Sequence, residues 1–63
     1  MNLKLARKKE GWTQTDLSKQ SNVCRTTISR IENGFIDAVP LYTLKKLATA
    51  LNSTVQELFL NEE

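Results

Sequence analysis

A pair of helix signals on either side of one turn residue constrains the fold of this chain more than any other feature. Thr13 is followed three residues later by Asp16, which is the spacing of a capping box at a helix start. This pattern predicts a helix over about residues 14–21. Asn22 then suits a corner, because asparagine adopts the left-handed backbone conformation more readily than most other residues with a side chain.

A second short helix is expected directly after that corner. Val23 and Ile28 are spaced as a hydrophobic staple around Cys24. The second helix should therefore begin near Arg25, and Gly34 is suited to end it. The two predicted helices are joined by a tight turn.

The two sides of this second helix differ in chemistry. At about 100° per residue, Ile28 and Ile31 share one side, whereas the other side carries two guanidinium groups and two hydroxyls and no carboxylate. Such groups bind guanine edges and phosphates and contact thymine methyls in a DNA major groove. We therefore expect base contacts from Arg25, Thr26, Ser29 and Arg30.

A longer run of residues has the spacing of a known DNA-binding motif. It comprises Gln14, Leu17-Ser18, Asn22-Val23, Thr27-Ile28-Ser29 and Ile31-Glu32-Asn33-Gly34. This run resembles the helix-turn-helix of the lambda-repressor and Cro type, also called the XRE family, and the resemblance extends from Leu3 to Phe59. It implies an all-α fold of five helices with the motif in helices 2 and 3. It also implies a bacterial or phage transcriptional regulator, a repressor that binds a palindromic operator as a homodimer.

The resemblance assigns roles to further side chains. In this family an arginine at the place of Arg7 pairs with a glutamate at the place of Glu32, and Gln14 contacts phosphate and braces the recognition helix. The helix dipole at Gln14 also favours a phosphate there. The other candidates for phosphate contacts are Asn33, Lys8 and Lys9. The alternative for the two lysines is that they lie on a solvent-exposed face of the first helix and contact no phosphate.

The segment after Gly34 departs from the family, which commonly carries basic residues there that touch the DNA backbone. Here the segment reads Phe35, Ile36, Asp37, Ala38 and Val39. Its apolar side chains either fold back onto the core or form part of a subunit interface. The candidates for a subunit interface are Phe35, Ile36, Tyr42 and Leu60.

The rest of the chain predicts three more helices. Periodicity indicates a first helix over residues 3–10 and a fourth over residues 40–52, with Pro40 at the first helical position. Thr54 and Glu57 have capping-box spacing and predict a last short helix. The side chains of the fourth helix that are expected in the core are Leu41, Leu44, Leu47, Ala48 and Leu51.

Charge is distributed unevenly along the 63 residues. Residues 1–30 carry seven basic and two acidic side chains, net +5, whereas residues 31–63 carry two basic and five acidic ones, net −3. A positive half can approach a polyanion while the negative half limits indiscriminate binding. A chance asymmetry is the alternative in so short a chain.

The composition excludes several kinds of site. There is no histidine and only one cysteine, so a Ser-His triad, a histidine metal site, a structural zinc site and an internal disulfide are ruled out. We expect no enzyme activity, no cofactor or metal, no small-molecule ligand, and one domain over residues 1–63. No apolar run is long enough for a signal peptide or a membrane span, which predicts a cytoplasmic protein. Cys24 is either a small residue that fits its place or a redox switch.

A protein-interaction module is the alternative function. An antitoxin-like partner of a second protein, with DNA binding secondary, would use Phe35, Ile36, Tyr42 and Leu60 as its contact surface.

Overall fold

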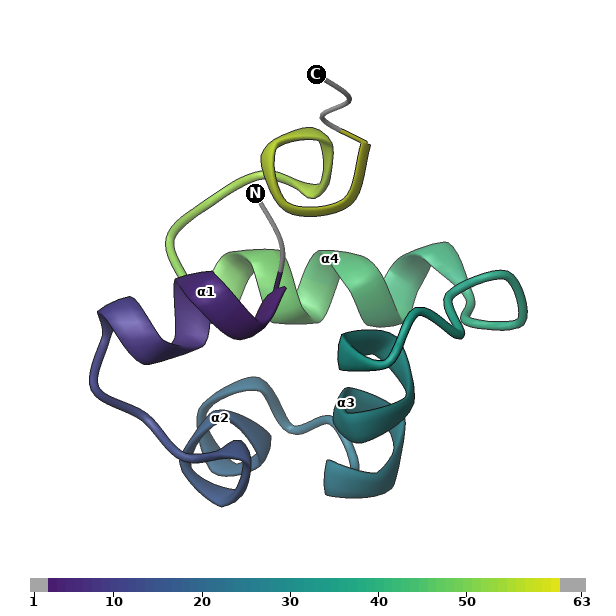
Figure 1. Ribbon diagram of the computed structural model, residues 1–63. Helices are drawn as coiled ribbons and strands as arrows, with labels where there is room; N and C mark the ends of the chain where they lie inside the picture. The colour runs from purple at the N-terminus through teal and green to yellow at the C-terminus, as the bar shows by residue number, and fades with distance from the viewer. Residues whose placement is uncertain (1–2, 61–63) are drawn as a thin grey trace.

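Five helices make up the computed structural model, which describes residues 3–60. They are α1 (Leu3–Lys9), α2 (Gln14–Ser21), α3 (Arg25–Glu32), α4 (Leu41–Ala50) and a final π-helical turn, η1 (Gln56–Leu60). In Figure 1, α4 crosses the middle of the molecule with η1 on one side and α2 and α3 on the other. The described residues contain helices and no strands, so the predicted all-α fold is confirmed.

The start of α2 follows directly from the local sequence. The Asp16 backbone N–H donates to the Thr13 hydroxyl at 3.0 Å, and the Thr13 N–H donates to the Asp16 carboxylate at 2.9 Å. This reciprocal capping box satisfies two N–H groups that the first turn of a helix leaves without partners. Its hydrogen bonds also lower the pKa of Asp16, chiefly through the Thr13 N–H. The predicted capping box is confirmed.

The corner between α2 and α3 needs a left-handed residue. Asn22 has φ of 61° and ψ of 33°, and its N–H donates to the Ser18 carbonyl at 2.8 Å. The Ser18 hydroxyl in turn donates to the Val23 carbonyl at 2.6 Å across the same corner. The predicted turn at Asn22 is therefore confirmed.

Gly34 ends α3 through two backbone hydrogen bonds. Its N–H donates to the Ile31 carbonyl at 3.0 Å, and the next N–H, of Phe35, donates to the Arg30 carbonyl at 2.9 Å. This pairing is a Schellman motif, which requires a left-handed residue, and Gly34 has φ of 93°. An added Cβ at Gly34 would meet nothing within 4 Å, so the glycine is needed only for its backbone conformation.

The start of α4 differs from the prediction. Pro40 is the N-cap residue, with φ of −62° and ψ of 149°, and not the first helical residue. Its carbonyl accepts the N–H groups of Thr43 and Leu44, so Pro40 precedes the helix and begins its hydrogen-bond ladder. The predicted capping box of the last helix is present, since the Glu57 N–H donates to the Thr54 hydroxyl at 3.1 Å.

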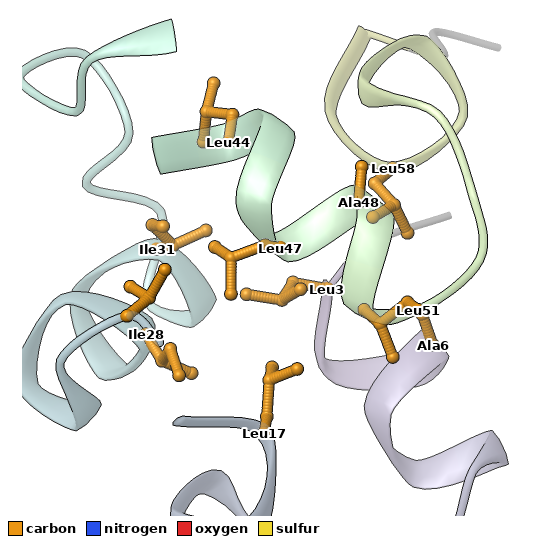
Figure 2. Packing of buried hydrophobic residues seen from close by; sticks show 11 residues of the cluster. Leu3, Ala6, Leu17, Ile28, Ile31, Leu44, Leu47, Ala48, Leu51 and Leu58 are labelled. Atoms are coloured by element: carbon orange, nitrogen blue, oxygen red, sulfur yellow. The ribbon is translucent and has the colours of Figure 1, made fainter. Parts of the chain in front are cut away.

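Every helix contributes to the core. The largest fully buried side chains are Leu3, Leu17, Ile28, Leu47 and Leu58. Figure 2 shows Leu47 of α4 between Ile31 of α3 and Leu3 of α1. Burying one such side chain contributes about 1.5–3 kcal/mol, so this cluster holds α3 in place from one side.

The prediction that Leu41 lines the core is wrong, because its side chain is 56% exposed. Leu41 lies in the first turn of α4, where helical side chains lean toward the N-terminus and away from the elements that cover the rest of the helix. Thr43 is buried instead, at 9% exposure.

Part of the segment before α4 folds back onto the core, as one of the two alternatives predicted. Ile36 and Val39 are half-buried and pack against the core. Phe35 is 68% exposed and does not fold back.

Candidate nucleic-acid interface

The two sides of α3 differ in exposure as well as in chemistry. Ile28 and Ile31 are 0% and 7% exposed and face the core. Arg25, Thr26 and Arg30 are exposed, and Ser29 is partly buried. We call these four residues the donor face of α3, namely Arg25, Thr26, Ser29 and Arg30.

The guanidinium groups of the donor face belong to exposed side chains. Within residues 3–60, neither Arg25 nor Arg30 makes an ion pair or a side-chain hydrogen bond. Arg7 contrasts with both, because all of its guanidinium nitrogens have partners. The two donor-face arginines can therefore bind a ligand without first giving up a partner among the described residues.

An open groove of about 870 Å³ runs beside the donor face. One wall consists of the donor face together with Asn33, and the other comes from residues 34–40 and the first turn of α4. The second wall includes Phe35, Asp37 and Tyr42. The structure thus brings the four predicted base-contacting residues together with one predicted phosphate contact, Asn33.

A buried ion pair holds the C-terminal end of α3, at Glu32. Glu32 accepts hydrogen bonds from Arg7 Nε at 2.8 Å and Arg7 Nη2 at 3.0 Å, so the implied pairing of these residues is present. Their side chains are only 9% and 5% exposed. Arg7 Nη1 donates to the Trp12 carbonyl at 2.8 Å, which ties α1 to the short segment before α2.

Gln14 extends this pair into a network of three helices. Its amide nitrogen Nε2 donates to Glu32 Oε1 at 3.0 Å, so Gln14 braces the C-terminal end of α3 from the start of α2. The amide has two N–H groups, and the second remains for another acceptor.

The network also sets the charge states of its members. Burial of Glu32 by itself raises the pKa of its carboxyl, but hydrogen bonds from Arg7 and Gln14 and the Arg7 charge outweigh burial and lower the pKa. The hydrogen bonds to Glu32 raise the pKa of Arg7. Both groups are therefore charged at neutral pH, and their pairing holds α3 against α1.

The two lysines predicted to contact phosphate lie elsewhere. Lys8 and Lys9 are exposed on α1, and neither lines the groove beside α3. Lys9 instead borders a small hollow of about 240 Å³ with Leu51 and Asn52 at the end of α4. The contact of Lys8 and Lys9 with phosphate therefore stays a prediction.

The side chains suggested for a subunit interface separate into three cases. Phe35 and Tyr42 are 68% and 65% exposed and line the groove. Ile36 is half-buried against the core of its own chain. The side chain of Leu60 lies outside the described part of the structure. Sequence reasoning did not place Phe35 and Tyr42 beside the donor face, because no periodicity reports how the loop between two helices turns back.

Cys24 precedes α3 as its N-cap residue and is exposed. Its thiol completes no capping hydrogen bond. The backbone N–H groups at the start of α3, first that of Thr26, lower the pKa of the thiol.

No helix within residues 3–60 is both long and apolar enough to cross a membrane.

Comparison with known proteins gives two matches. A protein-family model described as helix-turn-helix matches residues 3–58. The competence pilus inhibition repressor of Acinetobacter baylyi is 38% identical over 61 residues. That alignment covers 97% of this chain and 54% of the relative, so the chain spans about half the length of the relative. No solved structure matches the chain significantly.

Proposed function

The chain belongs to the XRE-type helix-turn-helix family of DNA-binding regulatory domains, and from this premise we propose that it represses transcription as a homodimer on a palindromic operator. The relative whose name includes a repressor supports the direction of regulation. The observation that carries the proposal is the donor face of α3, which bears no carboxylate and whose two arginines are exposed and make no ion pair or side-chain hydrogen bond within residues 3–60.

The side chains of the donor face are of the types that contact base edges in the DNA major groove. Arg25 and Arg30 can each bind guanine O6 and N7 in a bidentate manner, and the Thr26 methyl can contact a thymine methyl. Gln14 and Asn33 would fix the register on phosphates. The net charge of +5 on residues 1–30 supports approach to DNA by this half of the chain.

A palindromic operator requires two copies related by a twofold axis. Two α3 helices would then enter adjacent major grooves about 34 Å apart, one turn of the double helix. We propose that the subunits meet near the apolar start of α4, where Leu41 is 56% exposed, beside Phe35 and Tyr42. A small contact suffices there, because DNA that holds two copies on neighbouring half-sites raises their effective concentration.

Selection of bound fragments from a random DNA pool tests the proposal, because it reports site, symmetry and spacing together. We expect an inverted repeat with half-sites one helical turn apart. Arg25→Ala or Arg30→Ala should then cost about 1–3 kcal/mol on the selected site and relax the base preference at one position. Lys45→Ala is the matched control, since it removes a cation from the exposed side of α4 outside the groove. Unchanged preference in both arginine variants would refute base reading by the donor face.

The exposed side chains of Phe35, Leu41 and Tyr42 favour one second candidate, a protein-interaction module of the antitoxin-like kind. Light scattering and the same DNA selection distinguish the two. If the chain is a monomer in light scattering and enriches no DNA sequence in the selection, the interaction module becomes the better proposal and the repressor is refuted.

A further inference from the structure

We propose that Ser18 and Ser21 are positioning residues for DNA recognition, because their hydroxyls hold the two backbone groups of Val23 and thereby fix the start of α3. The inference rests on the base reading proposed above, and it does not require either serine to touch DNA. We call the two hydroxyls together with the N–H and C=O of Val23 the serine clamp.

The serine clamp joins α2 to the residue that links the corner to the N-cap of α3. The Ser18 hydroxyl donates to the Val23 carbonyl at 2.6 Å, and the Val23 N–H donates to the Ser21 hydroxyl at 3.3 Å. The Ser21 hydroxyl itself donates to the Leu17 carbonyl at 2.7 Å, which leaves its oxygen as an acceptor. Val23 and Ser21 are 6% and 7% exposed, so water has little access to this side of the corner.

The backbone offers no substitute for the serine clamp. Within residues 3–60, neither the N–H nor the C=O of Val23 takes part in a backbone–backbone hydrogen bond. A buried peptide group without a partner is costly, so the two hydroxyls decide how the peptide groups on either side of Val23 are oriented. Because each peptide group is planar, these orientations set the direction in which the chain enters α3.

The start of α3 depends on the serine clamp more than its end does. Cys24 is the N-cap residue, and its thiol completes no capping hydrogen bond, so no side chain caps the first turn. The C-terminal end is held separately by the hydrogen bonds that Glu32 accepts from α1 and α2. Loss of the clamp should therefore fray the first turn of α3 and leave the last turn in place.

The two ends of α3 carry different members of the donor face. Arg25 and Thr26 lie in the first turn, and Arg30 lies in the last. Hydrogen bonds to base edges require donor–acceptor distances of about 2.7–3.2 Å, so a frayed first turn no longer presents its side chains at that distance. The serine clamp therefore governs base preference at the positions that Arg25 and Thr26 contact, and not at the position that Arg30 contacts.

Hydrogen exchange on the free chain, followed by NMR, measures the serine clamp without DNA. Ser18→Ala and Ser21→Ala each remove one hydroxyl of the clamp. The Ile28 N–H donates to the Cys24 carbonyl at 3.1 Å and reports the first turn of α3, whereas the Asn33 N–H reports its end. We expect each variant to speed exchange of the Ile28 N–H about threefold to tenfold and to leave that of the Asn33 N–H unchanged.

Ser53→Ala is the matched control. It also removes a serine hydroxyl that donates to a backbone carbonyl, that of Leu51 at 3.4 Å, but this serine lies after α4 and not at the corner. The control should leave exchange of the Ile28 N–H unchanged.

Fluorescence anisotropy on the selected DNA site, its single-base variants and a mixed-sequence duplex tests the consequence for recognition. We expect Ser18→Ala to weaken binding to the selected site about threefold to tenfold, and binding to the mixed-sequence duplex by less than about twofold. The base preference lost should be the one lost in Arg25→Ala, and not the one lost in Arg30→Ala. Cys24→Ser in the Ser18→Ala background should restore this preference, because a hydroxyl caps a helix better than a thiol.

Three outcomes would overturn the inference alone. The first is unchanged exchange of the Ile28 N–H in both clamp variants. The second is an equal increase at the Ile28 and Asn33 N–H groups, or unfolding of both variants in circular dichroism, since either would make the serines general stabilisers of the fold. The third is a folded clamp variant that keeps every base preference or loses the one that depends on Arg30.

Failure of the proposed function gives a different result. An unsubstituted chain that enriches no DNA sequence would overturn the base reading, and with it the role of the serine clamp in recognition. The exchange experiment would still show whether the clamp holds the start of α3. Ser18→Ala and Ser21→Ala break the clamp on opposite sides of Val23, so one folded variant is enough for the test.

Discussion

Replacing Glu32 by Gln is expected to destabilise the fold by about 3 kcal/mol, because it removes the charge that neutralises a buried cation. Arg7 and Glu32 have side chains that are only 9% and 5% exposed, so water solvates only a small part of a guanidinium that loses its partner. The substitution keeps the size and shape of the side chain. Any loss of stability therefore reports on charge and hydrogen bonding and not on a cavity.

The hydrogen bonds at Glu32 set the size of the effect. The carboxylate accepts from Arg7 Nε at 2.8 Å, from Arg7 Nη2 at 3.0 Å and from Gln14 Nε2 at 3.0 Å. A glutamine at position 32 presents one oxygen, and its amide N–H groups face other donors. Each hydrogen bond to a charged group contributes about 1.5–3 kcal/mol, so the loss of one or two gives about 3 kcal/mol. A chain of this length has a total stability of about 3–9 kcal/mol, so the variant loses at least a third of it.

Urea denaturation followed by fluorescence measures this loss. The chain has a single tryptophan, Trp12, whose carbonyl accepts a hydrogen bond from Arg7 Nη1 at 2.8 Å, so the probe lies beside the network. At a urea dependence of about 1 kcal/mol per molar, the transition midpoint should fall by about 3 M. Glu57→Gln is the control, because Glu57 is an exposed carboxylate whose loss should cost less than about 1 kcal/mol.

A double substitution distinguishes the cost of one unpaired buried charge from the contribution of the ion pair as a whole. Arg7→Met combined with Glu32→Leu removes both charges and fills the same space with apolar groups. The double variant should be more stable than Glu32→Gln, since a buried pair costs most when one partner remains. A Glu32→Gln variant within about 1 kcal/mol of the original chain, or a double variant less stable than the single one, would refute the argument.

Three further predictions concern Glu32, Asp37 and Asn22. Because the folded pKa of Glu32 is below its ordinary value of 4.5, its stabilisation is present at neutral pH and is lost as pH falls through the folded pKa. Urea midpoints should therefore drop in acid for the original chain and less so for Glu32→Gln, and parallel curves would contradict this. Asp37→Asn removes a carboxylate from the groove and should tighten binding to all duplex sequences about twofold to fivefold at low salt, as measured by anisotropy, and an effect that does not fade with added salt would contradict it. Asn22→Ala should cost about 1 kcal/mol in urea unfolding, because φ is 61° there, whereas Asn22→Gly should cost less, and equal losses would contradict a backbone cause.

The parts of the fold that the sequence predicts well are encoded within a few neighbouring residues. The start of α2 depends on Thr13 and Asp16, and the end of α3 depends on Gly34, so no distant contact is needed to place either boundary. The burial of Ile28 and Ile31 follows from helical periodicity in the same way.

The errors and omissions have a tertiary origin. Leu41 has the spacing of a core residue, but within residues 3–60 its side chain in the first turn of α4 stays 56% exposed. The sequence predicts Phe35 and Tyr42 only as candidates for an apolar contact surface. Their place in the groove beside the donor face depends on the path of residues 34–40. Lys8 and Lys9 do not line the groove, which depends on how α1 packs and is not evident from their sequence positions, and their contact with phosphate stays a prediction.

The division of α3 into a buried side and an exposed side affects which substitutions the chain tolerates. Ile28 and Ile31 anchor the helix from one side, whereas Arg25, Thr26 and Arg30 add nothing to the core on the other. Under the proposed base reading, substitutions at these outward positions would change the target sequence while the free energy of unfolding stays nearly the same. A library randomised at the outward positions should consist largely of folded members, and retargeting should not require compensating changes elsewhere in the chain.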